Sequence, residues 1–158
     1  MPLWFRALFV TLLFPGTVAG FVPYRLAAGR YALPLPPGLF RWSGMALLLG
    51  GLALLLLTIW DFARSGHGTL APWDAPTALV DRRLYARVRN PMYLGVLACI
   101  VGQGLWRGSG GVLLYGGLMA VVLHLRVVRF EEPALQRQFG APYAEYLKRV
   151  SRWVPRWW

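Results

Sequence analysis

The chain has 158 residues, of which 57% are hydrophobic and 15% are charged, and its formal net charge is +11. This length corresponds to one domain, and the long uncharged blocks exclude an ordinary water-soluble protein. The basic charge alone would suggest nucleic acid, but its uneven placement along the chain argues against that partner, and the lone Cys99 excludes an internal disulfide or a cysteine-based zinc site.

Four blocks of the sequence are apolar enough to be considered as membrane-spanning helices: residues 3–21, interrupted only by Arg6, and residues 42–60, 91–106 and 108–125. A spanning helix needs roughly 20 such residues. The block 91–106 reaches only about 24 Å at 1.5 Å per residue, but Arg107 can extend from its end toward the headgroups. Because no block carries the polar stripe of a water-facing helix, we predict an all-α, polytopic membrane bundle with about four transmembrane helices rather than a soluble bundle.

The first part of this single domain, residues 1–64, is predicted to hold two spans. The first helix covers roughly residues 3–22, with a kink at Pro15 and Gly16. Residues 23–38 are rich in proline and predict an ordered external loop, and the second helix covers about 39–64. Residues 1–20 also resemble a signal peptide that ends on the small residues 17–20, but their basic region is thin.

The second part, residues 65–158, predicts a loop, a helical hairpin and an interfacial helix. A turn-rich loop covers residues 65–84. The third helix begins at Pro91, because Asn90 is a good N-cap and proline is favoured at the first helical position. A glycine-rich turn at 107–111 then joins the third and fourth helices, and small residues at four-residue spacing would let these two helices approach closely.

The chain is predicted to end in helices that lie at the membrane surface. The fourth helix continues to about Arg129, and a further helix runs from Pro133 to about Val150. The apolar positions of this last helix follow helical spacing while Arg137 and Lys148 lie elsewhere, which is typical of an interfacial amphipathic helix. The tryptophans from residue 153 onward also suit a membrane interface.

Charge is distributed very unequally between the two sides that four spans would create. One side receives only four of the 17 basic residues, namely Arg25, Arg30, Arg41 and Arg107, while the other receives the remaining basic residues and all 6 acidic residues. Cytoplasmic loops carry the excess of lysine and arginine. We therefore expect both termini to be cytoplasmic, in the inner membrane if the source is bacterial, with the charged face attracted to anionic headgroups.

Three polar clusters on this face are considered for binding or chemistry: residues 89–93, the glutamates at 131–132 and the loop 77–85. Residues 89–93 begin the third helix, whose free N–H groups can hold an anion such as a carboxylate, although a merely capped helix is the alternative. Glu131 and Glu132 follow His124, Arg126 and Arg129, and adjacent carboxylates need nearby cations. The alternative for this pair is a solvated helix start that favours acidic residues. The loop 77–85 alone indicates nothing beyond an ordinary loop, and the two histidines lack partners at a metal-binding spacing, so no metal is expected.

Taken together, these segments form an ordered series of motifs. Leu79-Val80, Tyr85 and the run Arg89-Asn90-Pro91-Met92-Tyr93-Leu94-Gly95 are followed by Glu131-Glu132-Pro133, Leu135, Phe139-Gly140, Tyr143 and Tyr146, and the series closes on Val154-Pro155. In this order the motifs resemble the isoprenylcysteine carboxyl methyltransferase family of membrane enzymes in its short bacterial form, a relative of the phospholipid N-methyltransferases. The resemblance covers roughly residues 66–156.

The resemblance implies methyl transfer from S-adenosyl-L-methionine, bound at the cytoplasmic end of the bundle, to a lipid or lipid-like acceptor such as a prenylated carboxylate. The positions that match the cofactor-binding motifs are Thr77, Ala78, Leu79, Val80, Tyr85, Asn90, Pro91, Met92, Tyr93 and Glu131. Arg126, Arg129 and Glu132 are assigned to placement of the substrate. Neither the acceptor nor the choice between O-, N- and S-methylation follows from these residues, and neither does the oligomeric state.

The sequence departs from the eukaryotic members of that family at two positions. Asn90 replaces the usual histidine, and asparagine keeps hydrogen bonding but cannot titrate near neutral pH. Val127 stands where those members carry an arginine that holds the substrate carboxylate, with Arg126 and Arg129 on either side. The alternative function is a non-catalytic membrane protein, a transporter subunit or a scaffold. A transporter would place ionisable residues near the middle of its spans, where this chain has none.

Overall fold

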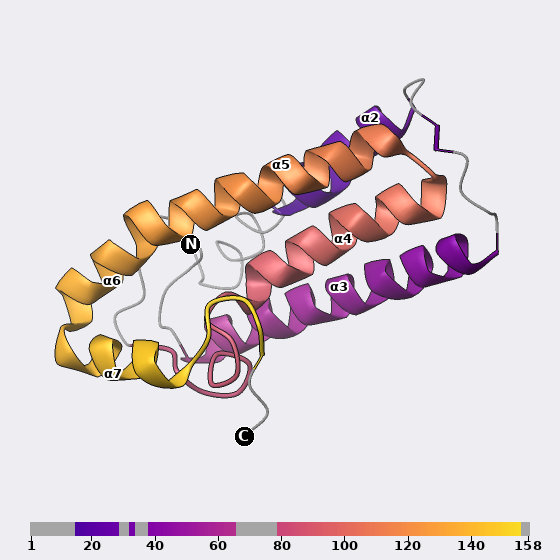
Figure 1. Cartoon of the computed structure of the whole chain (residues 1–158). Helices are drawn as coiled ribbons and strands as arrows, with labels where there is room; N and C mark the ends of the chain where they lie inside the picture. Colours follow the sequence, from indigo (N-terminus) through magenta and orange to yellow (C-terminus); the bar gives the residue numbers. More distant parts are fainter. Residues whose placement is uncertain (1–14, 29–31, 34–37, 66–78, 156–158) are drawn as a thin grey trace, which may run out of the picture.

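The computed structural model of the chain describes residues 15–28, 32–33, 38–65 and 79–155. Most of the predicted first helix and of the predicted loop 65–84 lies outside these residues. The described part is a bundle of helices (Figure 1). Its β-type pairing is limited, among the described residues, to isolated bridges between Ala32 and Ser109 and between Val88 and Ser151. The prediction of an all-α helical bundle is therefore confirmed.

Three long helices form the body of the bundle: α3 (Leu39–Ser65), α4 (Pro91–Arg107) and α5 (Gly110–Arg126). Successive helices run in opposite directions, and α4 lies between the other two (Figure 1). The predicted start of a helix at Pro91 is confirmed, and so is the tight turn after it, because Gly108 adopts a left-handed conformation (φ +62°) and the Ser109 side chain caps α5.

Glycines bring the backbones of α3 and α4 into direct contact. A Cβ added to Gly102 would lie 2.6 Å from the Leu48 nitrogen, and one added to Gly51 would lie 2.8 Å from the Cys99 nitrogen. The prediction that small residues allow close approach was correct, but it named the wrong partner for α4. The sequence suggested the hairpin with α5, whereas the glycine face of α4 packs chiefly on α3 because α3 carries glycines at matching heights.

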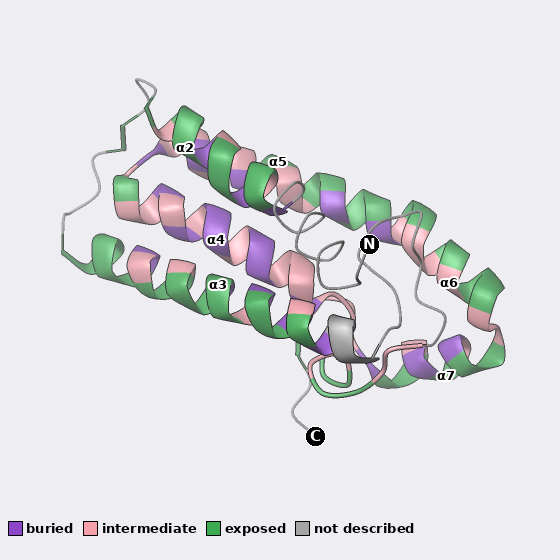
Figure 2. Ribbon diagram, turned by 180° about the vertical axis from the view of Figure 1, so that it is seen from behind, coloured by how far each residue is buried: buried purple, intermediate pink, exposed green. Residues whose placement is uncertain are grey.

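Two helical segments are long and apolar enough to cross a membrane, Leu39–Asp61 and Gly110–Phe139. Only 22% of the apolar stretch in each is buried inside the bundle, unlike the core helix of a soluble protein. Figure 2 shows that the outward faces of α3 and α5 are exposed, while buried positions concentrate along α4. The apolar surfaces of α3 and α5 therefore face outward, where a membrane would surround them.

The described N-terminal part is more helical than the sequence suggested. A π-helix (Thr17–Phe21) leads directly into α2 (Val22–Ala27), so that residues 23–27 are helix and not external loop. Pro23 lies in the first turn of α2, directly after the π-helix, and has no N–H group to donate to the carbonyls of the preceding turn. The carbonyls of Val18 and Ala19 in the π-helix accept bonds from Tyr115 and Gln103 (3.1 and 2.6 Å).

The C-terminal part was predicted as one helix and is two. From α5 the chain passes without a break through a second π-helix, η2 (Val127–Glu131), into α6 (Glu132–Phe139), and only then turns into α7 (Ala141–Arg149). The single helix predicted over 133–150 was therefore wrong. The turn occurs at Gly140, whose positive φ (+57°) ends α6. The segment after α7 then returns to the start of α4, where Arg89 N–H donates to the Ser151 carbonyl (2.9 Å).

Candidate functional site

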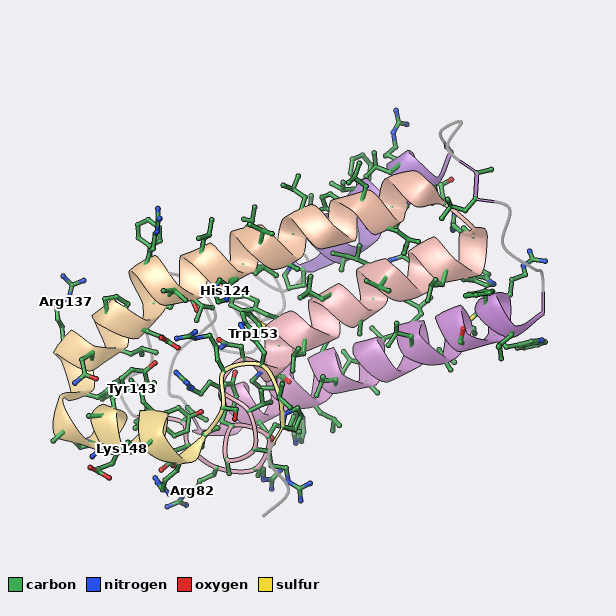
Figure 3. All side chains as sticks on the ribbon, in the orientation of Figure 1. Arg82, His124, Arg137, Tyr143, Lys148 and Trp153 are labelled. Carbon is green, nitrogen blue, oxygen red and sulfur yellow. The ribbon has the colours of Figure 1, made fainter. Side chains whose placement is uncertain are left out.

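Ionic side chains gather at the end of the bundle where α4 begins and η2 ends. This is the end opposite the α4–α5 turn, and α6, α7 and the C-terminal segment fold around it (Figures 1 and 3). The four ion pairs with partners more than three residues apart all lie here among the described residues. The predicted concentration of charge on one face thus corresponds to one end of the bundle.

Glu131 is the centre of the first cluster. Its Oε1 accepts a hydrogen bond from the Tyr93 hydroxyl and another from Arg126 Nε (2.7 Å). Arg126 and Glu131 are five residues apart, and a π-helix brings residues at that spacing onto one side. Both bonds that the structure describes end on Oε1, and Oε2 of this partly exposed carboxylate has no partner among the described residues.

Tyr93 places the start of α4 beside this carboxylate. Pro91 occupies the first helical position, and no side chain among the described residues caps the helix. The free backbone N–H groups of the first turn therefore lie at the same end of the bundle as Glu131. Asn90 was predicted to be the capping side chain, and this was wrong: it occupies the N-cap position, but its Nδ2 donates to the Arg152 carbonyl (3.2 Å), because the C-terminal segment passes next to it.

Glu132 is the centre of a second cluster with different partners. Arg89 Nη1 lies 2.6 Å from its Oε1, and Arg152 binds both carboxylate oxygens at 2.8 Å. Hydrogen bonding to Glu132 raises the pKa of Arg152. Arg89 also donates to the Val150 carbonyl (2.9 Å). We call these three charged residues the C-terminal clamp, because they fasten the segment after α7 to the starts of α4 and α6.

Buried tyrosines surround the two clusters. Burial raises the pKa of Tyr85, and the nearby Tyr93 and Glu131 raise it further. Burial also raises the pKa of Tyr143 to about 12. Tyr146 donates its hydroxyl to the Tyr85 carbonyl (2.8 Å), which ties α7 to the loop before α4. These phenols remain protonated at neutral pH and can act as hydrogen-bond donors.

A histidine–tryptophan pair joins the C-terminal segment to α5. Trp153 Nε1 donates to His124 Nδ1 (3.1 Å), with the ring centres 6.1 Å apart (Figure 3). His124 lies two residues before Arg126 in the last turn of α5. This contact and the C-terminal clamp together hold residues 150–153 against the end of the bundle.

The predicted site residues fall into three groups. Tyr93, Arg126 and Glu131 are brought together. Leu79 packs against the buried tyrosines of α7, and Val80 is half-buried. Pro91 and Met92 form the start of α4, where Pro91 is buried and Met92 packs against the hydrophobic core. Arg129 is exposed on η2, Glu132 belongs to the clamp, and Thr77 and Ala78 lie outside the described residues.

Sequence reasoning missed Arg152, Trp153 and the π-helix η2. The need of two adjacent glutamates for cations did indicate partners, and it correctly suggested Arg126. It could not select Arg152, which is 20 residues from Glu132 and follows a turn in a chain with 17 basic residues. No group of histidine, cysteine and acidic residues suited to a metal ion occurs within the described segments.

Comparison with known proteins identifies one family. The model of the phospholipid methyltransferase family matches residues 39–142, about two thirds of the chain. This range includes α3, α4, α5, η2 and α6, and with them Glu131 and Glu132, whereas Arg152 of the second cluster lies beyond it. The sequence has no significant match among curated proteins.

Proposed function

The chain belongs to the phospholipid methyltransferase family, and from this membership we propose that it is an integral membrane enzyme that methylates a lipid or lipid-like acceptor with S-adenosylmethionine. The family consists of membrane methyltransferases. The cofactor, the residues that hold it and the class of acceptor are the parts that we propose.

The chemistry of the Glu131 cluster fits this cofactor, which carries an ammonium group, a carboxylate and ribose hydroxyls. Oε2 of Glu131 suits the ammonium group or the hydroxyls, since a carboxylate accepts hydrogen bonds from both. The uncapped start of α4 suits the cofactor's carboxylate. Aromatic faces such as those of Tyr93 and Tyr85 suit a cationic centre. The oriented carboxylate of Glu131 is the observation that carries the proposal.

The residues of the chain contribute mainly by binding and orienting. When bound, S-adenosylmethionine supplies an electrophilic methyl group on its sulfonium. Tyr93 and Arg126 fix Glu131 in one position, and fixed contacts favour the in-line geometry that such a displacement requires. The buried tyrosines and the C-terminal segment restrict the access of water at this end of the bundle, which strengthens the electrostatic contacts within it.

A lipophilic acceptor is supported by the surface of the bundle. Exposed leucines on α3 and α5 face outward, so an acceptor dissolved in the bilayer can approach from the side. The resemblance of the sequence motifs to those of isoprenylcysteine carboxyl methyltransferases extends the proposal to acceptors such as a prenylated carboxylate. Val127 is buried, so the neighbouring Arg126 is the residue of this segment that we propose to place an anionic acceptor, with Arg129 as the second candidate.

We also propose the orientation of the protein in the membrane. The end of the bundle that holds the two glutamate clusters lies on the cytoplasmic side, together with both termini. The excess of arginine and lysine in this end supports that orientation.

The test is incubation of the purified protein with methyl-labelled cofactor and total membrane lipid, followed by identification of the labelled product. We expect label in a lipid fraction with the wild-type protein, and at least about tenfold less with Glu131→Gln, because removal of this charged partner costs more than about 1.4 kcal/mol. Glu145→Gln, on the outer surface of α7, is the control and should leave labelling unchanged. Absence of label in every lipid and lipid-modified protein fraction would favour the non-catalytic alternative.

A further inference from the structure

A hollow lies on the α3 side of the bundle and shares no residue with either glutamate cluster. Its volume is about 400 Å³, within the range of ligand sites. It is formed between α3, the turn at residues 81–88 and the first turn of α4, with walls of Leu54, Leu84, Val88 and Leu94. The walls are thus apolar, and its basic lining residues are Arg83 and Arg87.

Arg83 is held in an unusual way at this hollow. Its backbone is left-handed (φ +52°), a conformation that glycine or asparagine would adopt more readily. Its Nη1 lies 2.9 Å from Asp61 Oδ1, yet the side chain of Arg83 is 65% exposed while that of Asp61 is 9% exposed. The ion pair therefore anchors one edge of the guanidinium to α3 and leaves other N–H donors facing outward.

The hollow also lies at the height of a membrane interface. Leu54 belongs to the apolar stretch Leu39–Asp61, and the ion-pair partner of Arg83 is the residue at which this stretch ends. Leu56, Leu57 and Trp60 are exposed on the same part of α3. Apolar side chains thus give way to arginines at this level, as hydrocarbon gives way to phosphate in a bilayer.

We infer that this hollow binds an anionic phospholipid, with the lipid phosphate at Arg83 and Arg87 and the first part of an acyl chain against Leu54, Leu84 and Leu94. Guanidinium groups bind phosphate oxygens through charge-assisted hydrogen bonds, and basic pockets beside spanning helices recognise anionic headgroups. Because the site shares no residue with the Tyr93–Arg126–Glu131 cluster, we treat the lipid held here as distinct from the methyl acceptor. The inference therefore does not depend on the proposed methyl transfer.

Native mass spectrometry of the whole protein in detergent, with added phosphatidylglycerol or phosphatidylcholine, tests the site. We expect retention of phosphatidylglycerol by the wild-type protein and a loss of at least about fivefold with Arg87→Gln, since one charged hydrogen-bonded contact is removed. The double variant Asp61→Asn/Arg83→Asn should show a similar loss. Asparagine tolerates the left-handed backbone, and the paired change leaves no buried carboxylate without its cation.

Arg137→Gln is the matched control, because Arg137 is an exposed arginine that points away from the bundle on α6 (Figure 3). It should retain phosphatidylglycerol as the wild-type protein does, and Leu84→Gln should lose it. Binding of S-adenosylmethionine should be unchanged in all four variants. The inference is overturned if both arginine variants retain the lipid, if Arg137→Gln loses it equally, or if inorganic phosphate displaces it as effectively as phosphatidylglycerol does.

Discussion

At the scale of single residues, the adjacent glutamates perform different tasks because of where η2 ends. Glu131 closes the π-helix and faces Tyr93 and Arg126, whereas Glu132 begins α6 and faces Arg89 and Arg152. Each carboxylate thus has a cationic partner of its own, Arg126 for Glu131 and Arg89 with Arg152 for Glu132, and these positive charges offset the repulsion between the two carboxylates. Of the pair, Glu131 is the one whose second carboxylate oxygen has no partner among the described residues.

Replacement of Tyr93 by phenylalanine tests how Glu131 is oriented. The change removes one hydrogen bond to the carboxylate while Arg126 still holds it, so we expect cofactor affinity to fall by about 3–10-fold, within the range for a hydrogen bond to a charged group. Tyr143→Phe, which alters a buried phenol on α7, should change affinity less than about twofold. Calorimetry measures both affinities. Equal losses of cofactor affinity in the two variants would contradict the placement of Tyr93 in the cofactor site.

Sequence reasoning succeeded for residues whose role depends on near neighbours. Arg126 and Arg129 were predicted to supply the cations for the two glutamates; Arg126 does so for Glu131 in the same helical segment, whereas Arg129 is exposed and forms no ion pair with a described carboxylate. Asn90 was assigned the wrong partner, since local rules favour the N-cap bond and contain nothing about a segment 62 residues away that offers a carbonyl. The roles of Arg89 and Arg152 depend on the same distant segment and were equally inaccessible.

At the scale of elements, the contact between α3 and α4 depends on glycines. For Gly102→Ala we expect a loss of stability of about 1–3 kcal/mol, because the new methyl group would meet backbone atoms of Leu48 and Gly44 that cannot move independently. Gly50→Ala on the open side of α3 is the control and should be neutral or stabilising, since nothing lies within 4 Å of its added Cβ. Thermal unfolding in detergent measures both, and equal melting temperatures would contradict close packing at Gly102.

The C-terminal clamp makes a second prediction at this scale. Glu132→Gln removes the charge that joins Arg89 to Arg152, so residues 150–155 should detach more often and trypsin should cut after Arg152 faster than in the wild-type protein. Glu145→Gln removes an exposed pair with Lys148, and such a surface pair contributes about 0–1 kcal/mol. Its cleavage rate should therefore match the wild-type rate. A Glu132→Gln protein that is cut no faster would show that other contacts hold the segment.

The elements that could be predicted are those with strong end signals. The bounds of α3 and α4 follow from long apolar blocks, from proline at the start of α4 and from glycine after its end. The division between α6 and α7 was missed because apolar spacing continues across Gly140, although its left-handed backbone redirects the chain. Neither π-helix has a sequence signature, since each depends on the contacts made by the surrounding helices.

At the scale of the whole molecule, the two ends of the bundle differ in composition and in charge. The α4–α5 turn and α2 lie at one end, and the ionic clusters, α6, α7 and the C-terminal segment lie at the other. Composition and charge predicted the bundle and this asymmetry, because both are properties of the chain as a whole. They could not predict that α4 would be the central helix, which depends on how glycine faces match in three dimensions.

The proposed orientation predicts which residues can be reached from each side of the membrane. In sealed vesicles, Glu145→Cys on α7 should react with an impermeant thiol reagent only from the cytoplasmic side, and Ala28→Cys after α2 only from the other side. The native Cys99 is buried in α4 and should remain unlabelled in both variants. Labelling of both introduced cysteines from one side would contradict the predicted arrangement of spans.

The central claim, that Glu131 and the start of α4 bind S-adenosylmethionine, is tested most directly by titration calorimetry of the purified protein in detergent. We predict saturable binding that the demethylated product S-adenosylhomocysteine competes for, and a loss of at least about tenfold in affinity with Glu131→Ala. Glu145→Ala should bind as the wild-type protein does. Absence of binding heat together with absence of competition, or equal affinity in the Glu131→Ala protein, would contradict the claim.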